Sequence, residues 1–139
     1  MPMTMNPTTF WNLSNHALGD SWTAEQVAEA VAWGGGGPNR LVDVHFPQVD
    51  PAADSEAVEA LADHTLAGLL AAGAQSGEGI MLMGEFTLVY ALVRRLQAAG
   101  LTPVVATSAR EARATVQPDG SVLQEHRFRF VRFRAYAAG

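Results

Sequence analysis

The chain has 139 residues, of which 48% are hydrophobic and 17% charged, values that fit one folded domain and exclude a chain that is disordered over most of its length. Its net charge of −5 argues against a long DNA duplex as partner, and the absence of cysteine excludes disulfide bonds, thiolate zinc sites and a cysteine nucleophile. Because no apolar stretch approaches the roughly 18 residues of a spanning helix and the first residues lack a signal-peptide pattern, we expect a cytoplasmic protein with no membrane partner.

Apolar periodicity and capping signals divide residues 8–106 into alternating strands and helices. The first helix is marked by Thr23 with Gln26 three residues later, a capping-box spacing. The expected order is strand 8–14, a helix from Thr23, strand 41–46, a helix from near Asp54 to 73, strand 79–83, helix 86–99 and strand 103–106. Such alternation predicts an α/β fold with a mainly parallel sheet, right-handed crossovers and helices on both faces, a Rossmann-like arrangement.

The last thirty residues follow a different pattern. Residues 112–117 read as a strand, Pro118 to Gly120 as a tight turn and 121–133 as a long partner strand, which together predict a C-terminal β-hairpin. We therefore divide the single domain 1–139 into a core over 1–110 and a hairpin over 111–139. The phenylalanines of the last strand change parity, and this predicts a bulge near Phe130. The bulge would gather four arginines on the outer face: Arg127, Arg129, Arg132 and Arg134.

Polar residues follow each of the four expected parallel strands, with Pro47 and Gln48 after the second. In an open parallel sheet, ligands bind beyond the carboxyl ends of the strands. Free amides at the start of helix 86–99 favour an anion, and Arg110 is suited to clamp a phosphate. An alternative is that these short polar side chains only cap helices and close turns. The candidate ligand-binding residues are Asn12, Ser14 and Asn15 after the first strand, Gly84, Glu85, Phe86 and Thr87 after the third, and Thr107, Ser108 and Arg110 after the fourth.

The candidate chemistry at this edge needs no metal and no cofactor. His16 is the only histidine expected there and the only plausible general acid or base. All nine cationic side chains are arginine, which removes any mechanism based on a lysine. The sequence contains no His-x-x-x-His pair and no P-loop lysine.

Several of these motifs together resemble a known group of proteins. They are the segment Asn12 to His16 followed by Trp22 and Gln26, then Gly84 to Thr87, Ala106 to Arg110, and Gln117 to Ser121 leading to His126 and the Val131 to Arg134 strand. In combination they are similar to small stand-alone CRISPR-associated proteins related to the Rossmann-like CARF sensor domains. The resemblance extends over nearly the whole chain.

The resemblance implies a function in type III CRISPR signalling. It implies that a homodimer binds a cyclic oligoadenylate messenger, cyclic tetra-adenylate in the first place, across its two-fold axis and cleaves it by metal-independent attack of a ribose 2′-hydroxyl. Ser14, Asn15 and Thr87 would hold the ring. Arg110 and the amides of Gly84 to Thr87 would stabilise the phosphorane, and His16 would move the proton. Two alternatives remain open: a non-catalytic sponge or sensor for the messenger, and an unrelated nucleotide-binding module.

Overall fold

A computed structural model describes residues 8–138 and shows an α/β fold built on one five-stranded sheet. The strand order is β2-β1-β3-β4-β5, and every neighbouring pair is parallel except β4 with β5. The expected mainly parallel α/β fold is thereby confirmed. Expectations for residues 1–7 and 139 lie outside the described residues. The elements are β1 (Thr9–Ser14), α1 (Leu18–Ser21), α2 (Ala24–Val31), the short 3-10 helix η1 (Trp33–Gly35), β2 (Arg40–His45), α3 (Ser55–Ala71), β3 (Gly79–Leu82), α4 (Phe86–Ala98), β4 (Thr102–Val116) and β5 (Val122–Ala135).

The helices cover both faces of the sheet. In β1, Trp11 packs in the core shared with α3 and α4, whereas its neighbour Phe10 packs in a second core with Ala30 of α2. β3 alternates in the same way and is buried along its whole length, as its nearly continuous apolar sequence predicts. The carboxyl ends of β1 and β3 therefore lie between two layers of helices, with α2 on one side and α4 on the other.

The helix starts follow the predicted caps. The Thr23 hydroxyl accepts a hydrogen bond from the Gln26 amide at 3.2 Å, and the Asp54 carboxylate accepts one from the Ala57 amide at 2.9 Å. The Gln26 side chain does not complete the capping box. It is buried and donates to the Met81 sulfur at 3.6 Å. Tertiary packing against the sheet thus takes the side chain that the local motif would use.

The fourth strand is much longer than expected, and the prediction of a turn at Thr107 to Arg110 is wrong. β4 runs without interruption from Thr102 to Val116, so the proposed division after residue 110 falls inside a strand. The physical reason is that this stretch contains no Gly and no Pro after Pro103, while β5 supplies a partner for each of its residues from Val104 onward. Thr107, Ser108 and Arg110 are strand residues rather than loop residues.

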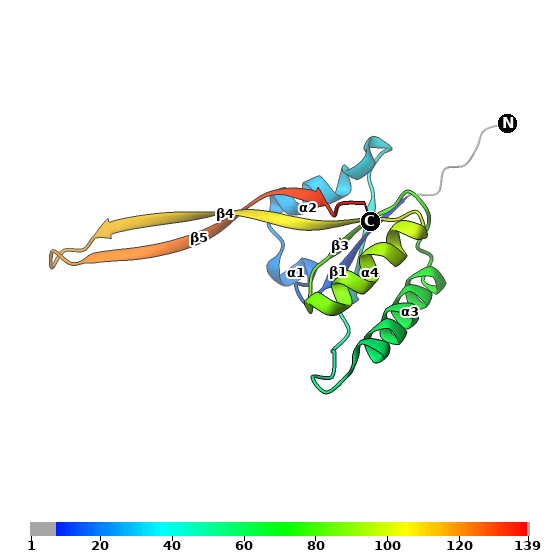
Figure 1. Cartoon of the computed structure of the whole chain (residues 1–139). Helices are drawn as coiled ribbons and strands as arrows, with labels where there is room; N and C mark the ends of the chain where they lie inside the picture. Colours follow the sequence, from blue (N-terminus) through cyan, green and yellow to red (C-terminus); the bar gives the residue numbers. More distant parts are fainter. Residues whose placement is uncertain (1–7, 139) are drawn as a thin grey trace.

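The distal parts of β4 and β5 form a two-stranded arm, residues 108–130, that projects from the body (Figure 1). A bulge marks its base: Thr107 pairs with Arg132 and Ser108 with Phe130, so one extra residue, Val131, lies in β5. The bulge predicted near Phe130 is confirmed. It turns Phe130 and Phe133 to the same side, where their ring centroids lie 5.1 Å apart.

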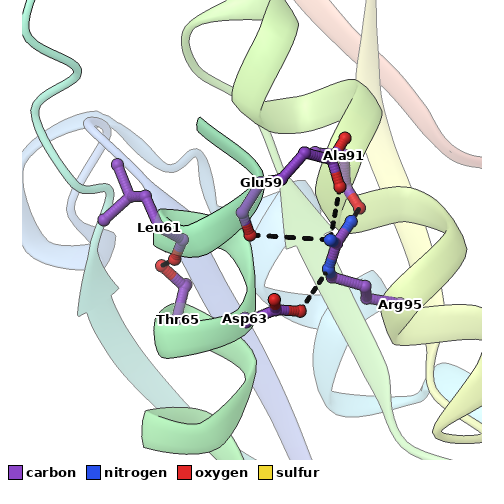
Figure 2. Close-up of polar contacts among 6 residues, drawn as sticks. All are labelled: Glu59, Leu61, Asp63, Thr65, Ala91 and Arg95. Atoms are coloured by element: carbon purple, nitrogen blue, oxygen red, sulfur yellow. Dashed lines mark hydrogen bonds and ion pairs between the residues drawn. The ribbon is translucent and has the colours of Figure 1, made fainter. Parts of the chain in front are cut away.

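An ion-pair cluster links α3 to α4 on the opposite face (Figure 2). The Arg95 guanidinium donates to the Asp63 carboxylate at 2.7 Å and to the Glu59 carboxylate, and it also donates to the Ala91 carbonyl at 2.8 Å. These carboxylates, that of Asp63 foremost, raise the pKa of Arg95. The cluster aligns the two helices beside the sheet. Across the described residues, helices of the length and apolarity needed to span a membrane are absent.

Candidate functional site

A cavity of about 360 Å³ lies on the α2 side of the sheet, where the arm leaves the body. Its walls are formed by the loop after β1, the start of α2, the end of β3, the middle of β4 and the part of β5 at the base of the arm. Its volume is near the lower end of the range for small-ligand sites. The lining residues are His16, Ser21, Trp22, Thr23, Gln26, Met81, Met83, Ala106, Thr107, Ser108, Phe128 and Phe130.

Three of the predicted site residues meet in this cavity. They are His16 from the loop after β1 and Thr107 and Ser108 from β4. Arg110 lies two residues beyond Ser108 on the same face of β4, and its register partner is Phe128, which lines the cavity. Because the side chains of paired residues share a face, Arg110 stands at the outer margin of the cavity. The β4 residues reach the site as part of a strand and not as a turn.

The aromatic side chains of the cavity are the part that sequence reasoning missed. Trp22 follows α1, and its indole N–H donates to the His16 carbonyl at 3.0 Å. Phe128 and Phe130 come from β5, and Phe128 is 71% exposed. Their parity in the sequence indicated a shared face, but their position beside Ser108 depends on the strand register, which a single sequence does not reveal.

Asn12 and Ser14 hold the His16 loop in place. Both are buried. The Ser14 hydroxyl donates to the Asn12 Oδ1 at 2.7 Å and accepts from the His16 amide at 3.1 Å, while the Asn12 Nδ2 donates to the His16 carbonyl and to Asp43, each at 2.8 Å. Asn15 and His16 are exposed. This network fixes the backbone of His16 on both sides and leaves its imidazole at the rim of the cavity.

The predicted anion site at the start of α4 holds a carboxylate of the chain itself. Glu85 accepts from the Leu88 amide at 2.8 Å, from the Thr87 amide at 3.1 Å and from the Thr87 hydroxyl at 2.6 Å. The bond from the Thr87 side chain, followed by those from the two amides, lowers the pKa of Glu85. The amides that were expected to bind a ligand therefore already have an anionic partner.

The other residues of this segment also lie apart from His16. Gly84 touches the Phe46 ring so closely that an added Cβ would come within 2.5 Å of it, which gives this glycine a packing role. Phe86 and Thr87 line a different cavity of about 550 Å³ beside the start of α3. The structure does not bring Gly84 to Thr87 into the cavity that contains His16, Thr107 and Ser108.

The cavity can bind a flat aromatic group and place an anion beside it. Phe130, Phe128 and Trp22 offer ring faces and edges, Thr107 and Ser108 lie among the lining residues, and Arg110 stands at the margin. His16 is the titratable side chain among the lining residues. Over residues 8–138, no group of three or more His, Cys, Asp or Glu side chains is placed to hold a metal ion.

Sequence comparison assigns the chain to a family. A model of the uncharacterized protein MJ1673 family matches residues 8–134. The chain belongs to this family. The match begins just before β1 and ends within β5, so that both strands of the arm and all the residues that line the cavity lie inside it. No curated protein and no solved structure matches the chain.

Proposed function

We propose that the protein binds a cyclic oligoadenylate at the cavity beside His16 and cleaves it without a metal. Cyclic tetra-adenylate is the ligand that we propose first. The observation that carries the proposal is the meeting of aromatic side chains, His16, Thr107 and Ser108 in one cavity with Arg110 at its margin. The element order of the body supports a Rossmann-like, CARF-like domain. In this proposal the protein acts in the cytoplasm as a homodimer and ends messenger signalling in type III CRISPR defence.

The aromatic part of the cavity is suited to an adenine base. Stacking of a base on an aromatic side chain contributes about 1–3 kcal/mol, and Phe128 and Phe130 present such a surface beside the Thr107 and Ser108 strand. A volume of about 360 Å³ accommodates one nucleotide of the ring rather than the whole ring. The adjoining phosphate would then extend toward the margin of the cavity, where Arg110 can donate two parallel hydrogen bonds to it.

The chemistry follows from positioning of the ring. The ribose 2′-oxygen loses its proton to the His16 imidazole and attacks the adjacent phosphorus, and the bond from phosphorus to the 5′-oxygen breaks. The leaving 5′-oxygen takes up a proton, which the imidazolium can return, so the products are a 2′,3′-cyclic phosphate and a free 5′-hydroxyl. Because nucleophile and electrophile belong to one molecule, a correct geometry supplies much of the rate. Arg110 would stabilise the charge on the phosphorane.

The test is incubation of the protein with labelled cyclic tetra-adenylate in EDTA, followed by separation of the products. Linear oligoadenylates ending in 2′,3′-cyclic phosphate are expected, with the linear tetra-adenylate as the first product. His16→Ala should slow cleavage by about 100-fold or more while changing affinity only slightly, and equal losses in rate and affinity would reduce His16 to a positioning residue. Arg110→Ala should weaken binding by roughly 10-fold or more. Arg113→Ala, on the other face of the arm, is the matched control.

A sponge or sensor for the messenger is the second candidate. It is favoured by the single imidazole at the rim of the cavity, where the lining residues supply no second titratable group to act as the acid. Binding of the labelled ring without any linear product would support it and reject the nuclease. An unrelated nucleotide-binding module would be indicated if cyclic oligoadenylates gave no rise in thermal midpoint, since a ligand that binds the folded state must raise it.

A further inference from the structure

The arm has one apolar face and one charged face. The register places the even-numbered residues 108–116 of β4 and 122–130 of β5 on one side, here called the apolar face. Six of its ten residues are apolar, and Arg110 is its single permanently charged residue. The charged face, the odd-numbered residues 109–115 and 123–129, has five charged side chains among eight. Such alternation is the pattern of a sheet that buries one face.

The body of the chain covers the apolar face only at its base, where Phe130 packs against the core. Val116 is 73% exposed, Phe128 71% and Val122 57%, and the arm projects away from the helices (Figure 1). An isolated two-stranded hairpin is marginally stable in water at best. We propose that the apolar face packs on the apolar face of a second copy of this chain, with the two arms antiparallel, so that the tip of each arm closes the cavity of the other copy.

The distribution of charge favours a second copy in this orientation. The arm, residues 108–130, contains four arginines and three acidic residues, a net charge of +1, whereas the rest of the chain contains five arginines and eleven acidic residues, a net charge of −6. Antiparallel arms set the positive arm of each copy beside the negative body of the other. Parallel arms would set the two negative bodies side by side, where like charges repel.

The shape of the body favours the same orientation. Trp22 and Thr23 share the cavity with Phe128 and Phe130, so α1 and α2 rise on the same side of the sheet as the apolar face. If the arms were parallel, the helices of both copies would have to occupy one gap between the stacked sheets. When the arms are antiparallel, the helices lie at opposite ends of the assembly, and each tip meets the helices of the other copy.

Away from the axis, the residues that meet across the interface differ in size, and on the axis Ala112 and His126 each meet the same residue of the partner. A two-fold axis at the rung of Ala112 and His126 sets Phe130 against the partner's Val122 and Ser108 against the partner's Val116. Large side chains then lie against smaller ones. Arg110 lies against the partner's Ala114, which keeps the two Arg110 side chains apart. Because Ser108 and Phe130 line the cavity, the partner's Val116 and Val122 would form its missing wall.

The contact between the two arms supplies part of the area that a specific dimer needs. The face is about 27 Å long and about 10 Å wide including side chains, or about 270 Å² of flat area per copy, and the contact of each tip with the helices of the other copy adds to this area toward the roughly 1,000 Å² in total of a specific interface. The two cavities then lie about 27 Å apart. They would hold two ligands per dimer rather than one ring across the axis, and only this last point rests on the proposed function.

Sedimentation equilibrium without any nucleotide tests the dimer. The wild-type chain should be a dimer, and Val116→Asp/Val122→Asp should raise the dissociation constant on the order of 100-fold, because each Asp would be buried without a partner. The matched control, Thr115→Asp/Leu123→Asp, changes the neighbouring rung on the charged face and should remain a dimer. A monomeric wild-type chain, or equal weakening by both variants, would overturn the proposal. Circular dichroism of both variants excludes unfolding as the cause.

Introduced cysteines test the orientation, because the native chain has none. A mixture of Ser108→Cys and Val116→Cys chains should be cross-linked by a short bismaleimide at least about 10-fold faster than either variant alone, and Ser108→Cys with Thr115→Cys is the control. Faster self-linking of Ser108→Cys would overturn the antiparallel arrangement. Calorimetry with cyclic tetra-adenylate separates the two proposals: a dimer that binds no nucleotide rejects the function alone, and a monomer that binds it rejects the dimer alone.

Discussion

The Glu29 carboxylate accepts a hydrogen bond from the Phe133 backbone amide at 3.0 Å and so joins α2 to the outer strand of the sheet. Phe133 lies two residues past the bulged residue Val131, on a strand that has no further neighbour in the sheet. An unpaired amide at such a position would be a buried donor without an acceptor, because Phe133 is 1% exposed. One side chain of α2 therefore secures the base of the arm.

Replacement of Glu29 by alanine should lower the free energy of unfolding by about 1–3 kcal/mol, because it leaves this amide unsatisfied. Glu29→Gln keeps an oxygen acceptor and should cost less than half as much. Urea denaturation measures both, with Glu25→Ala, exposed on the same helix, as control. If Glu29→Ala and Glu25→Ala were equally mild, the contact would not stabilise the arm.

Glu78 is a buried carboxylate with a structural role of its own. One oxygen accepts from the Thr9 amide at 2.7 Å, and the other accepts from the Gln75 amide at 2.6 Å and from the Trp11 indole at 3.0 Å. Glu78→Gln should destabilise the fold by about 1–3 kcal/mol, since its NH₂ group would face a donor on one side. Glu56→Gln, exposed in the first turn of α3, should change stability by a few tenths of a kcal/mol at most. Urea denaturation measures both variants, and equal denaturation midpoints for the two would contradict the structural role of Glu78.

Substitutions at Gly84 can show whether this glycine has a packing role or a ligand-binding role. Gly84→Ala should cost about 1–3 kcal/mol because its Cβ meets the Phe46 ring, and the added substitution Phe46→Leu should recover part of that loss by making room. Thermal unfolding checks both variants. If the double variant regained stability but failed to bind cyclic tetra-adenylate, Gly84 would have a ligand-binding role after all. Normal binding is the result expected from its position.

The arrangement of the body could be predicted from local signals, whereas the site could not. The caps at Thr23 and Asp54 and the apolar residues of β3 act locally, so the order of strands and helices follows from them. The continuity of β4 through Thr107 to Arg110 depends on pairing with β5, a contact between distant residues.

The site depends on the same distant contacts. Ser108 meets Phe130 only through the register after the bulge, and Trp22 reaches the cavity through a bond to the His16 carbonyl. At the start of α4, the sequence predicted a site that the structure does not leave open. An open anion site was expected from a general property of helix ends, but Glu85 at the cap supplies its own carboxylate. Polar residues at strand ends therefore predict at which edge of the sheet the site lies, but they do not predict which side chains would contact a ligand.

The Glu85 cap predicts a pH dependence. Folding lowers the pKa of Glu85 below 4.5. The ionised carboxylate therefore contributes stability that is fully present above the pKa of the unfolded chain and is lost as the pH falls through the pKa of the folded chain. Glu85→Gln should therefore lower stability at pH 7 and reduce the loss on acidification below pH 4.5. Urea midpoints between pH 7 and 3 measure this effect. An unchanged acid dependence in Glu85→Gln would show that the carboxylate contributes no stability as the cap of α4.

The most direct measurement is a crystal structure of the His16→Ala variant with uncleaved cyclic tetra-adenylate. We predict an adenine beside Phe130 within the cavity, the next phosphate within hydrogen-bond distance of the Arg110 guanidinium, and Glu85 still bound to the amides of α4. A ligand at the start of α4 with the cavity empty, or crystals with no ligand at saturating concentration, would contradict the account.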